Sequence, residues 1–175
     1  MKKSDITSMP EYFDRYINLV EDGEVLEILE HYGIQWLEGY RDVFVRLGDS
    51  VYAPGKWTIR DILRHLIDTE RIFVYRALAF ARGDKTLQPG FDEDLYAASA
   101  HESLGTLDEL FEEFAVVRAA TISFYKTLNS DMLQCEGIAF QKNISVLAIG
   151  FLIAGHALHH CGVIRERYYP LLTNQ

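Results

Sequence analysis

SVLAIGFLIAGHALHHCGVIRERYY, residues 145–169, is a long apolar helical pattern that contains three of the chain's six histidines. Its core-facing positions follow steps of four, three, four and four, and they are Ile149, Ile153, His156, His160 and Ile164. Two imidazoles therefore interrupt an aliphatic stripe that should face the protein interior. Residues four apart on a helix are neighbours, so both rings can reach one cation, as in half of a zinc or iron site. Ser145 is a suitable N-cap for this helix.

Composition restricts the class of protein. With 175 residues, 49% of them hydrophobic, and only four prolines, we expect residues 1–175 to form one globular domain. The net charge of −9 opposes binding to nucleic acid. No apolar run reaches the ~20 residues that span a bilayer, and the N-terminus lacks the apolar core of a signal peptide, so we expect a cytoplasmic protein without membrane partners. Cys135 and Cys161 follow no disulfide or metal spacing and should be small hydrophobic residues.

The rest of the chain predicts more helices. Apolar periodicity indicates a short helix packed over the bundle and three long ones, at Pro10–Leu19, Glu24–Leu47, Thr58 to about Arg82, and Thr106–Leu128. We interpret residues 132–143 as a connection to the last helix rather than as a reliable strand. The irregular link Gly83–Ser103 is long enough to let the second and third long helices run parallel, and it should border the access to any site inside. These elements predict an all-α four-helix bundle with a long crossover between helices 2 and 3.

The second long helix supplies a third candidate ligand. His65 lies on the apolar stripe of that helix, and a lone histidine there is more often a core residue than a ligand. Together with His156 and His160, it would complete a three-imidazole site that leaves positions for water or substrate. His159 lies on a different side of its helix, with two glycines, which suits a polar contact or an outer role rather than direct ligation. His31 falls off the apolar stripe and His101 falls in the link, so we expect both to be solvated.

Two segments resemble those of a known family. WTIRDILRHLIDTE at residues 57–70 is similar to the second-helix motif of the DinB/YfiT-like superfamily, and IAGHALHH at 153–160 followed by RERY at 165–168 is similar to its fourth-helix motif. The resemblance spans nearly the whole chain. It implies a bundle with an unusual parallel central connection, a divalent metal held by His65, His156 and His160, and a homodimer. Relatives include metal-dependent hydrolases and transferases that join bacillithiol, mycothiol or glutathione to a second small molecule.

The chain departs from that family at one position. Many relatives carry Glu directly after the first histidine of the pair, where this chain has Ala157, so a metalloprotease mechanism with that Glu as general base is not indicated. Asp68 and Glu70 are candidate replacements, although each is equally interpreted as a solvated or salt-bridged helix residue.

Two functions follow from these observations. The first is a metal-dependent enzyme of thiol-S-transferase or hydrolase type, using Zn, Ni or Fe and a low-molecular-weight thiol on a small-molecule substrate. The second is a non-catalytic stress-response or interaction module with a structural metal or none. An open coordination site favours the first function, and Ala157 favours the second.

Overall fold

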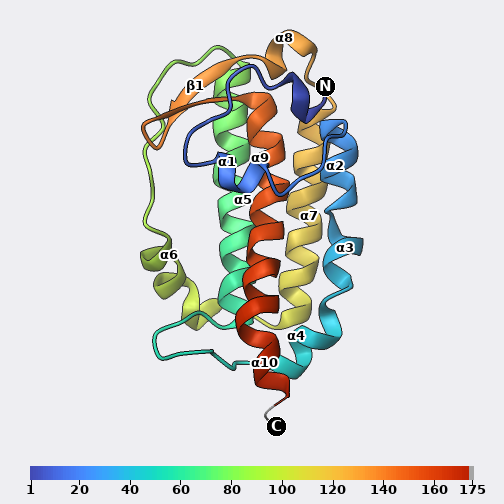
Figure 1. Ribbon diagram of the computed structural model, residues 1–175. Helices are drawn as coiled ribbons and strands as arrows, with labels where there is room; N and C mark the ends of the chain where they lie inside the picture. Colours follow the sequence, from blue (N-terminus) through green and yellow to red (C-terminus); the bar gives the residue numbers. More distant parts are fainter. Residues whose placement is uncertain (174–175) are drawn as a thin grey trace.

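A computed structural model describes residues 1–173, and four helical stretches form a bundle (Figure 1). Three stretches are long single helices, namely α5 (Ile59–Ala81), α7 (Leu107–Tyr125) and α9 (Val146–Val163). The fourth is divided into α2 (Val25–His31), α3 (Ile34–Glu38) and α4 (Arg41–Leu47). The buried residues of these helices form the core, and they are mainly aliphatic and aromatic, as the helical periodicity predicts. The all-α four-helix bundle is confirmed.

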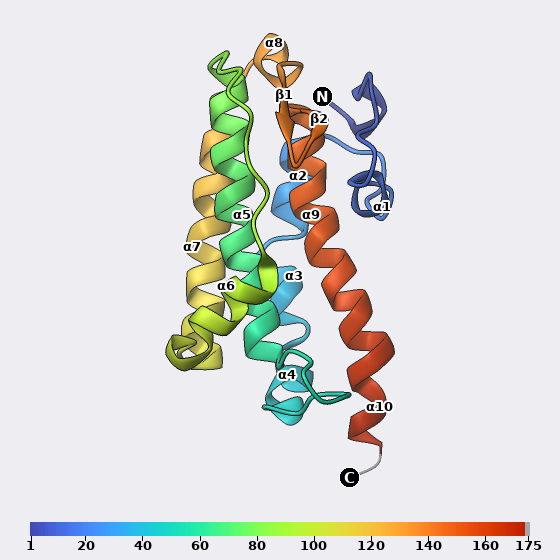
Figure 2. The ribbon, with the colours of Figure 1, turned by 90° about the vertical axis from the view of Figure 1, so that its left-hand side faces the viewer.

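The second and third long helices run in the same direction. Residues 82–106 pass back along the outside of α5 before α7 begins, so both helices start at the same end of the bundle (Figures 1 and 2). The predicted long crossover is therefore confirmed. It contains α6 (Glu93–Ala100) and a short 3-10 turn, η2 (His101–Ser103). Sequence periodicity missed α6 because Ala97 is the one buried residue on this eight-residue helix.

The prediction of one continuous helix over Glu24–Leu47 is wrong, because the chain breaks near Gly33 and Gly39. At the first break, the guanidinium of Arg118 donates hydrogen bonds to the carbonyls of Leu29 and Tyr32. A carbonyl held by a side chain from another helix is diverted from the helical ladder, and the chain turns at Gly33. Local propensity does not reveal this long-range contact.

The expectation of a plain connection over residues 132–143 is also wrong. The chain forms α8 (Ser130–Leu133) and then an antiparallel hairpin of β1 (Glu136–Ala139) and β2 (Lys142–Ser145). The two-residue turn, Phe140 and Gln141, has φ values of +50° and +61°. Hairpin turns of this kind strongly prefer Asn-Gly or Asp-Gly, so Phe-Gln gives no recognisable turn signal.

The N-terminal segment packs across the bundle, as predicted for residues 10–19. It begins with η1 (Lys3–Asp5), and its helix α1 (Asp14–Ile17) lies against α9. The contact depends on Gly155, where a Cβ atom would lie 2.1 Å from the carbonyl oxygen of Tyr16. Only glycine permits this approach of two backbones.

The last helix has the predicted beginning. The hydroxyl of Ser145 accepts a hydrogen bond from the N–H of Ala148 at 3.1 Å, which caps α9. A π-helical turn η3 (Ile164–Tyr168) and α10 (Tyr169–Leu172) continue it. The stretch 146–172 is long and apolar enough to cross a membrane, but 72% of its most apolar window is buried inside the protein. That burial is what the core helix of a soluble bundle shows.

Candidate metal centre

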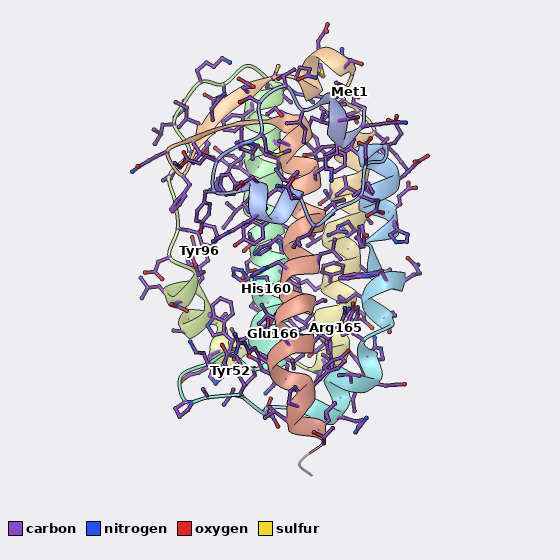
Figure 3. All side chains as sticks on the ribbon, viewed as in Figure 1. Met1, Tyr52, Tyr96, His160, Arg165 and Glu166 are labelled. Carbon is purple, nitrogen blue, oxygen red and sulfur yellow. The ribbon has the colours of Figure 1, made fainter. Side chains whose placement is uncertain are left out.

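Three imidazoles from two helices meet inside the bundle. His65 on α5 and His160 on α9 each place Nε2 3.1 Å from Nε2 of His156, one turn earlier on α9. One ring nitrogen from each residue lies within 4.8 Å of the other two. His160 is labelled in Figure 3, where α9 passes α5 about halfway along the bundle. The structure thus brings together the three histidines that the sequence selects.

The three rings are uncharged near neutral pH. Burial lowers the pKa of His65 to about 4. Burial also drives the pKa values of His156 and His160 well below their usual range, and the imidazoles of His65 and His159 lower both further. A metal ion binds the neutral imidazole through its lone pair, so the cluster is held in the form that ligation requires.

The spacing of the rings suits a shared cation better than a chain of hydrogen bonds. Nε2 of His156 faces two ring nitrogens, yet it carries either one proton or one lone pair and forms a good hydrogen bond with only one of them. Nitrogens that share a zinc-like ion at about 2.0–2.1 Å lie about 3–4 Å apart. Three imidazoles are a donor set for Zn, Ni or Fe rather than for Mg or Ca. The residues present therefore fit a divalent transition metal.

Neighbouring side chains fix the orientation of the imidazoles. The hydroxyl of Thr69, one turn after His65, lies 3.4 Å from Nδ1 of that ring, a position from which it can accept the Nδ1 proton and leave Nε2 free. The indole of Trp57 lies 4.8 Å from the His65 ring and is stacked 6.4 Å from the His160 ring. Phe73 contacts His156 edge-on, with ring centroids 5.9 Å apart. The centre is therefore walled by aromatic rings.

Trp57 occupies this position because of how α5 begins. The next residue, Thr58, caps the helix in a reciprocal capping box with Asp61. The main-chain carbonyl of Trp57 also accepts a hydrogen bond from the hydroxyl of Tyr168 in η3. The start of α5 and the turn that follows α9 thus hold the tryptophan in place.

A cleft of about 230 Å³ leads to the three imidazoles. One wall comes from the crossover, through Gly90, Phe91 and Glu93, as the sequence predicts for the link. The remaining lining residues come from the N-terminal segment, α5, α9 and the hairpin, and they are Tyr12, Phe13, Tyr16, Trp57, His65, Thr69, Phe73, Arg76, Phe140, His156, His159 and His160. The cleft is therefore largely aromatic, with one guanidinium and one carboxylate.

The other three histidines are not members of the cluster. His159 lines the cleft and packs edge-on against Tyr16 at 5.1 Å, and burial lowers its pKa, but it is not one of the three residues whose nitrogens converge. His31 is exposed on α2. His101 is exposed at the end of the crossover, where it forms a hydrogen bond with Asp61 of α5.

The two candidate carboxylates do not line the cleft. Asp68 lies on the outer side of α5, in ion pairs with Arg64 and Arg71. Glu70 is buried, where it pairs with Arg118 and accepts a hydrogen bond from Thr121 at 2.7 Å. The carboxylate that does border the cleft is Glu93 of α6.

Several cleft residues were not assigned from the sequence. Arg76 follows His65 by eleven residues on α5, which places both on one face of the helix, and that spacing was an available signal. Tyr12, Tyr16 and Phe140 belong to segments that reach the cleft through tertiary packing alone. Tyr12 and Phe140 both have positive φ values, +75° and +50°, a strained conformation for non-glycine residues that is frequent near functional sites.

The fold and the site together define a class, namely a four-helix bundle with a parallel central crossover and a three-histidine cluster compatible with a metal centre. A model of the DinB superfamily matches residues 11–164, so the chain belongs to that superfamily. Comparison with curated proteins finds no match.

A solved structure has the same architecture. It is YfiT from Bacillus subtilis, described as a probable metal-dependent hydrolase with an unusual four-helix bundle topology. The similarity has a TM-score of 0.64 at 19% identity, and it covers 92% of this chain and 88% of that chain. At this level of identity, the comparison shows a shared fold.

Proposed function

We propose that the protein is a metal-dependent enzyme of thiol-S-transferase or hydrolase type that acts on a small molecule. The observation that carries the proposal is the convergence of the three imidazoles at the end of an open, aromatic cleft. His65, His156 and His160 would hold the metal. A divalent transition metal supplies Lewis acidity there, which lowers the pKa of a thiol or water that it binds.

The protein's own residues would exclude water and orient the substrate. Trp57 and Phe73 flank the imidazoles and give the site a low dielectric, which strengthens electrostatic interactions inside it. Thr69 would keep His65 in the tautomer that presents Nε2. The crossover wall, with Phe91 and Glu93, would define one side of the substrate position.

An enzyme is favoured over a purely structural metal because of this access. A structural ion is normally closed off by four protein ligands, whereas a catalytic one keeps a position for substrate. Three imidazoles that border a cleft of about 230 Å³ leave such a position. Ala157, the residue after the first histidine of the pair, provides no carboxylate base, so thiol chemistry, in which the thiolate is itself the nucleophile, is as well supported as hydrolysis.

Metal content tests the first part of the proposal. Purified wild type should hold one divalent transition metal per chain by elemental mass spectrometry, and the His65→Ala, His156→Ala double variant should hold almost none. His31→Ala, His101→Ala and His159→Ala are matched controls that should keep wild-type loading. Equal loading in wild type and the double variant would refute the assigned ligands.

A substrate screen tests the second part. Bacillithiol, mycothiol and glutathione would each be offered with a chlorodinitrobenzene electrophile, and nitrophenyl esters would be offered with water alone. Turnover that is lost on chelation and regained with metal, while circular dichroism stays helical, is the expected result. Loss of the helical signal on chelation would instead identify a structural metal and a non-catalytic module.

We also propose that the protein is a homodimer, on the resemblance to its family. Light scattering at micromolar concentration should give twice the chain mass of 20.1 kDa. A monomer mass would refute this.

A further inference from the structure

Two arginines are buried in the described residues, and they differ in their partners. Arg118 is 2% exposed and forms a bidentate ion pair with Glu70, with N–O distances of 2.9 and 3.0 Å. Arg76 is 5% exposed, and within residues 1–173 no carboxylate lies within 4 Å of its guanidinium. Its polar contact is one hydrogen bond from Nη2 to the carbonyl of Pro89, at 2.7 Å.

An unpaired buried guanidinium is costly. Removing a charge from water is compensated by a partner of opposite charge, by several hydrogen bonds or by an aromatic face. Arg76 has the last of these from Phe73, whose ring centroid lies 5.8 Å from the guanidinium carbon. Burial lowers the pKa of Arg76, yet an arginine side chain keeps its proton at any physiological pH. Arg76 thus places a positive charge in the wall of the cleft without a protein anion to neutralise it.

The remaining N–H groups of Arg76 open onto the cleft. A guanidinium has five N–H donors, and Pro89 takes one of them. No side-chain nitrogen or oxygen of the described residues is sealed from solvent without a hydrogen-bond partner, so Nε and Nη1 of Arg76, which have none, reach solvent, and Arg76 lines the cleft. They are available to a ligand.

Arg76 shares one face of α5 with the metal centre. His65, Thr69, Phe73 and Arg76 follow at steps of four, four and three, and all four line the cleft. At about 1.5 Å per residue, the Cα atoms of the first and last are about 16 Å apart. Between them lies the aromatic lining of the cleft.

We propose that Arg76 binds the carboxylate of the substrate, so that the substrate class is a small molecule with an apolar or aromatic body and a carboxylate remote from its reacting group. A carboxylate matches the planar fork of a guanidinium, and the aromatic walls match an apolar body. The substrate carboxylate would be the negative partner that Arg76 lacks among the described residues. The orientation of the reacting group toward the imidazoles rests on the proposed function, whereas the binding of the carboxylate does not.

Binding should be measured on metal-free protein, so that a carboxylate cannot coordinate a metal instead. Isothermal titration calorimetry would compare phenylbutanoate with its uncharged amide. We expect the carboxylate to bind wild type at least about tenfold more tightly than the amide, the usual size of a charge-assisted hydrogen-bond pair. The same preference should disappear in Arg76→Met, and Arg76→Lys should retain a part of it.

Two controls separate this site from other cations. Arg82→Met changes an exposed arginine that directly follows α5, and Arg15→Met changes an exposed arginine stacked on Tyr12 and Tyr16 near the cleft. Both should keep the wild-type preference within about twofold, since long-range interactions with exposed charges are weak. The arginine side-chain NMR resonance of Arg76 in wild type should also shift with the carboxylate and not with the amide, which tests the site even if Arg76→Met fails to fold.

Equal binding of carboxylate and amide, no carboxylate binding at millimolar concentration, or an unchanged preference in folded Arg76→Met would overturn the proposal. The metal-content assay tests the proposed enzyme independently of the carboxylate site. A protein that binds the carboxylate through Arg76 but holds no metal would refute the proposed enzyme and leave this site, and the converse result would refute only the carboxylate site.

Discussion

The side chain of Arg118 joins three parts of the bundle. From α7 it forms an ion pair with Glu70 on α5 and donates to the carbonyls of Leu29 and Tyr32 at the end of α2. Every group in this network is buried and satisfied. Such a buried pair adds little net stability, but removal of one partner leaves the other charge buried and uncompensated, which is strongly destabilising.

Arg118→Met should therefore destabilise the protein strongly, because the carboxylate of Glu70 stays buried without its counter-ion. A loss of about 3–5 kcal/mol in the free energy of unfolding is expected, measured by urea denaturation. The double variant with Glu70→Met should recover much of that loss. Lys126→Met, which removes an exposed ion pair with Glu30 at the C-terminal end of α7, is the control and should cost less than about 1 kcal/mol. A double variant as unstable as the single one would contradict the explanation.

At the scale of elements, the sequence predicted those features of the helices that depend on neighbouring residues alone. The spacing of His156 and His160 and the cap at Ser145 are properties of a few neighbouring residues, and both appear in the structure as the sequence indicates. The break at Gly33, in contrast, depends in part on Arg118, far along the chain. The hairpin was missed because its turn residues, Phe140 and Gln141, are atypical for positive φ.

The hairpin turn gives a prediction of its own. Gln141 is exposed and has a φ of +61°, a conformation that costs a residue with a Cβ about 1 kcal/mol relative to glycine. Gln141→Gly should raise the free energy of unfolding by about that amount in urea denaturation. Gln141→Ala is the matched control, since it removes the same side chain but keeps the Cβ, and it should bring no gain. Stabilisation by alanine as well would show that the side chain, rather than the backbone, is responsible.

At the scale of the whole molecule, the crossover forms one wall of the cleft in front of the three imidazoles. It is attached to the bundle at separated points, by Gln88 to the hairpin, by Pro89 to Arg76, and by His101 to Asp61. Between these points, Phe91 and Glu93 wall the cleft. The sequence indicated that such a segment would border the site, whereas its attachment points depend on partners from α5 and β1 that no local pattern encodes.

The attachment at His101 should depend on pH. The hydrogen bond with Asp61 raises the pKa of His101, so this contact stabilises the fold fully below the ordinary histidine value of about 6.5 and is lost as pH rises through the raised value. Burial tends to raise the pKa of Asp61, but the hydrogen bonds from His101 and Thr58 outweigh burial and lower the pKa. Asp61 therefore stays ionised until the solution is acidic, and only there does its protonation weaken the contact with His101. The attachment is strongest between the two transitions.

Hydrogen exchange measures this effect. Protection of α6, corrected for intrinsic exchange, should be higher at about pH 5 than at about pH 8 in wild type, with no such difference in His101→Gln. His31→Gln, at an exposed histidine on α2, should behave like wild type. Equal protection of α6 at both pH values in wild type would rule out the attachment.

The close contact at Gly155 has a consequence for how the protein is made. Tyr16 leaves the ribosome long before Gly155, and at ~5–20 residues per second the wait is on the order of ten seconds. During that time, α1 has no α9 to pack against, and Phe13 and Ile17, which are buried in the finished protein, stay exposed on the nascent chain. The N-terminal wall of the cleft is therefore assembled late, and the early segment that forms it is a natural binding site for chaperones that hold nascent chains.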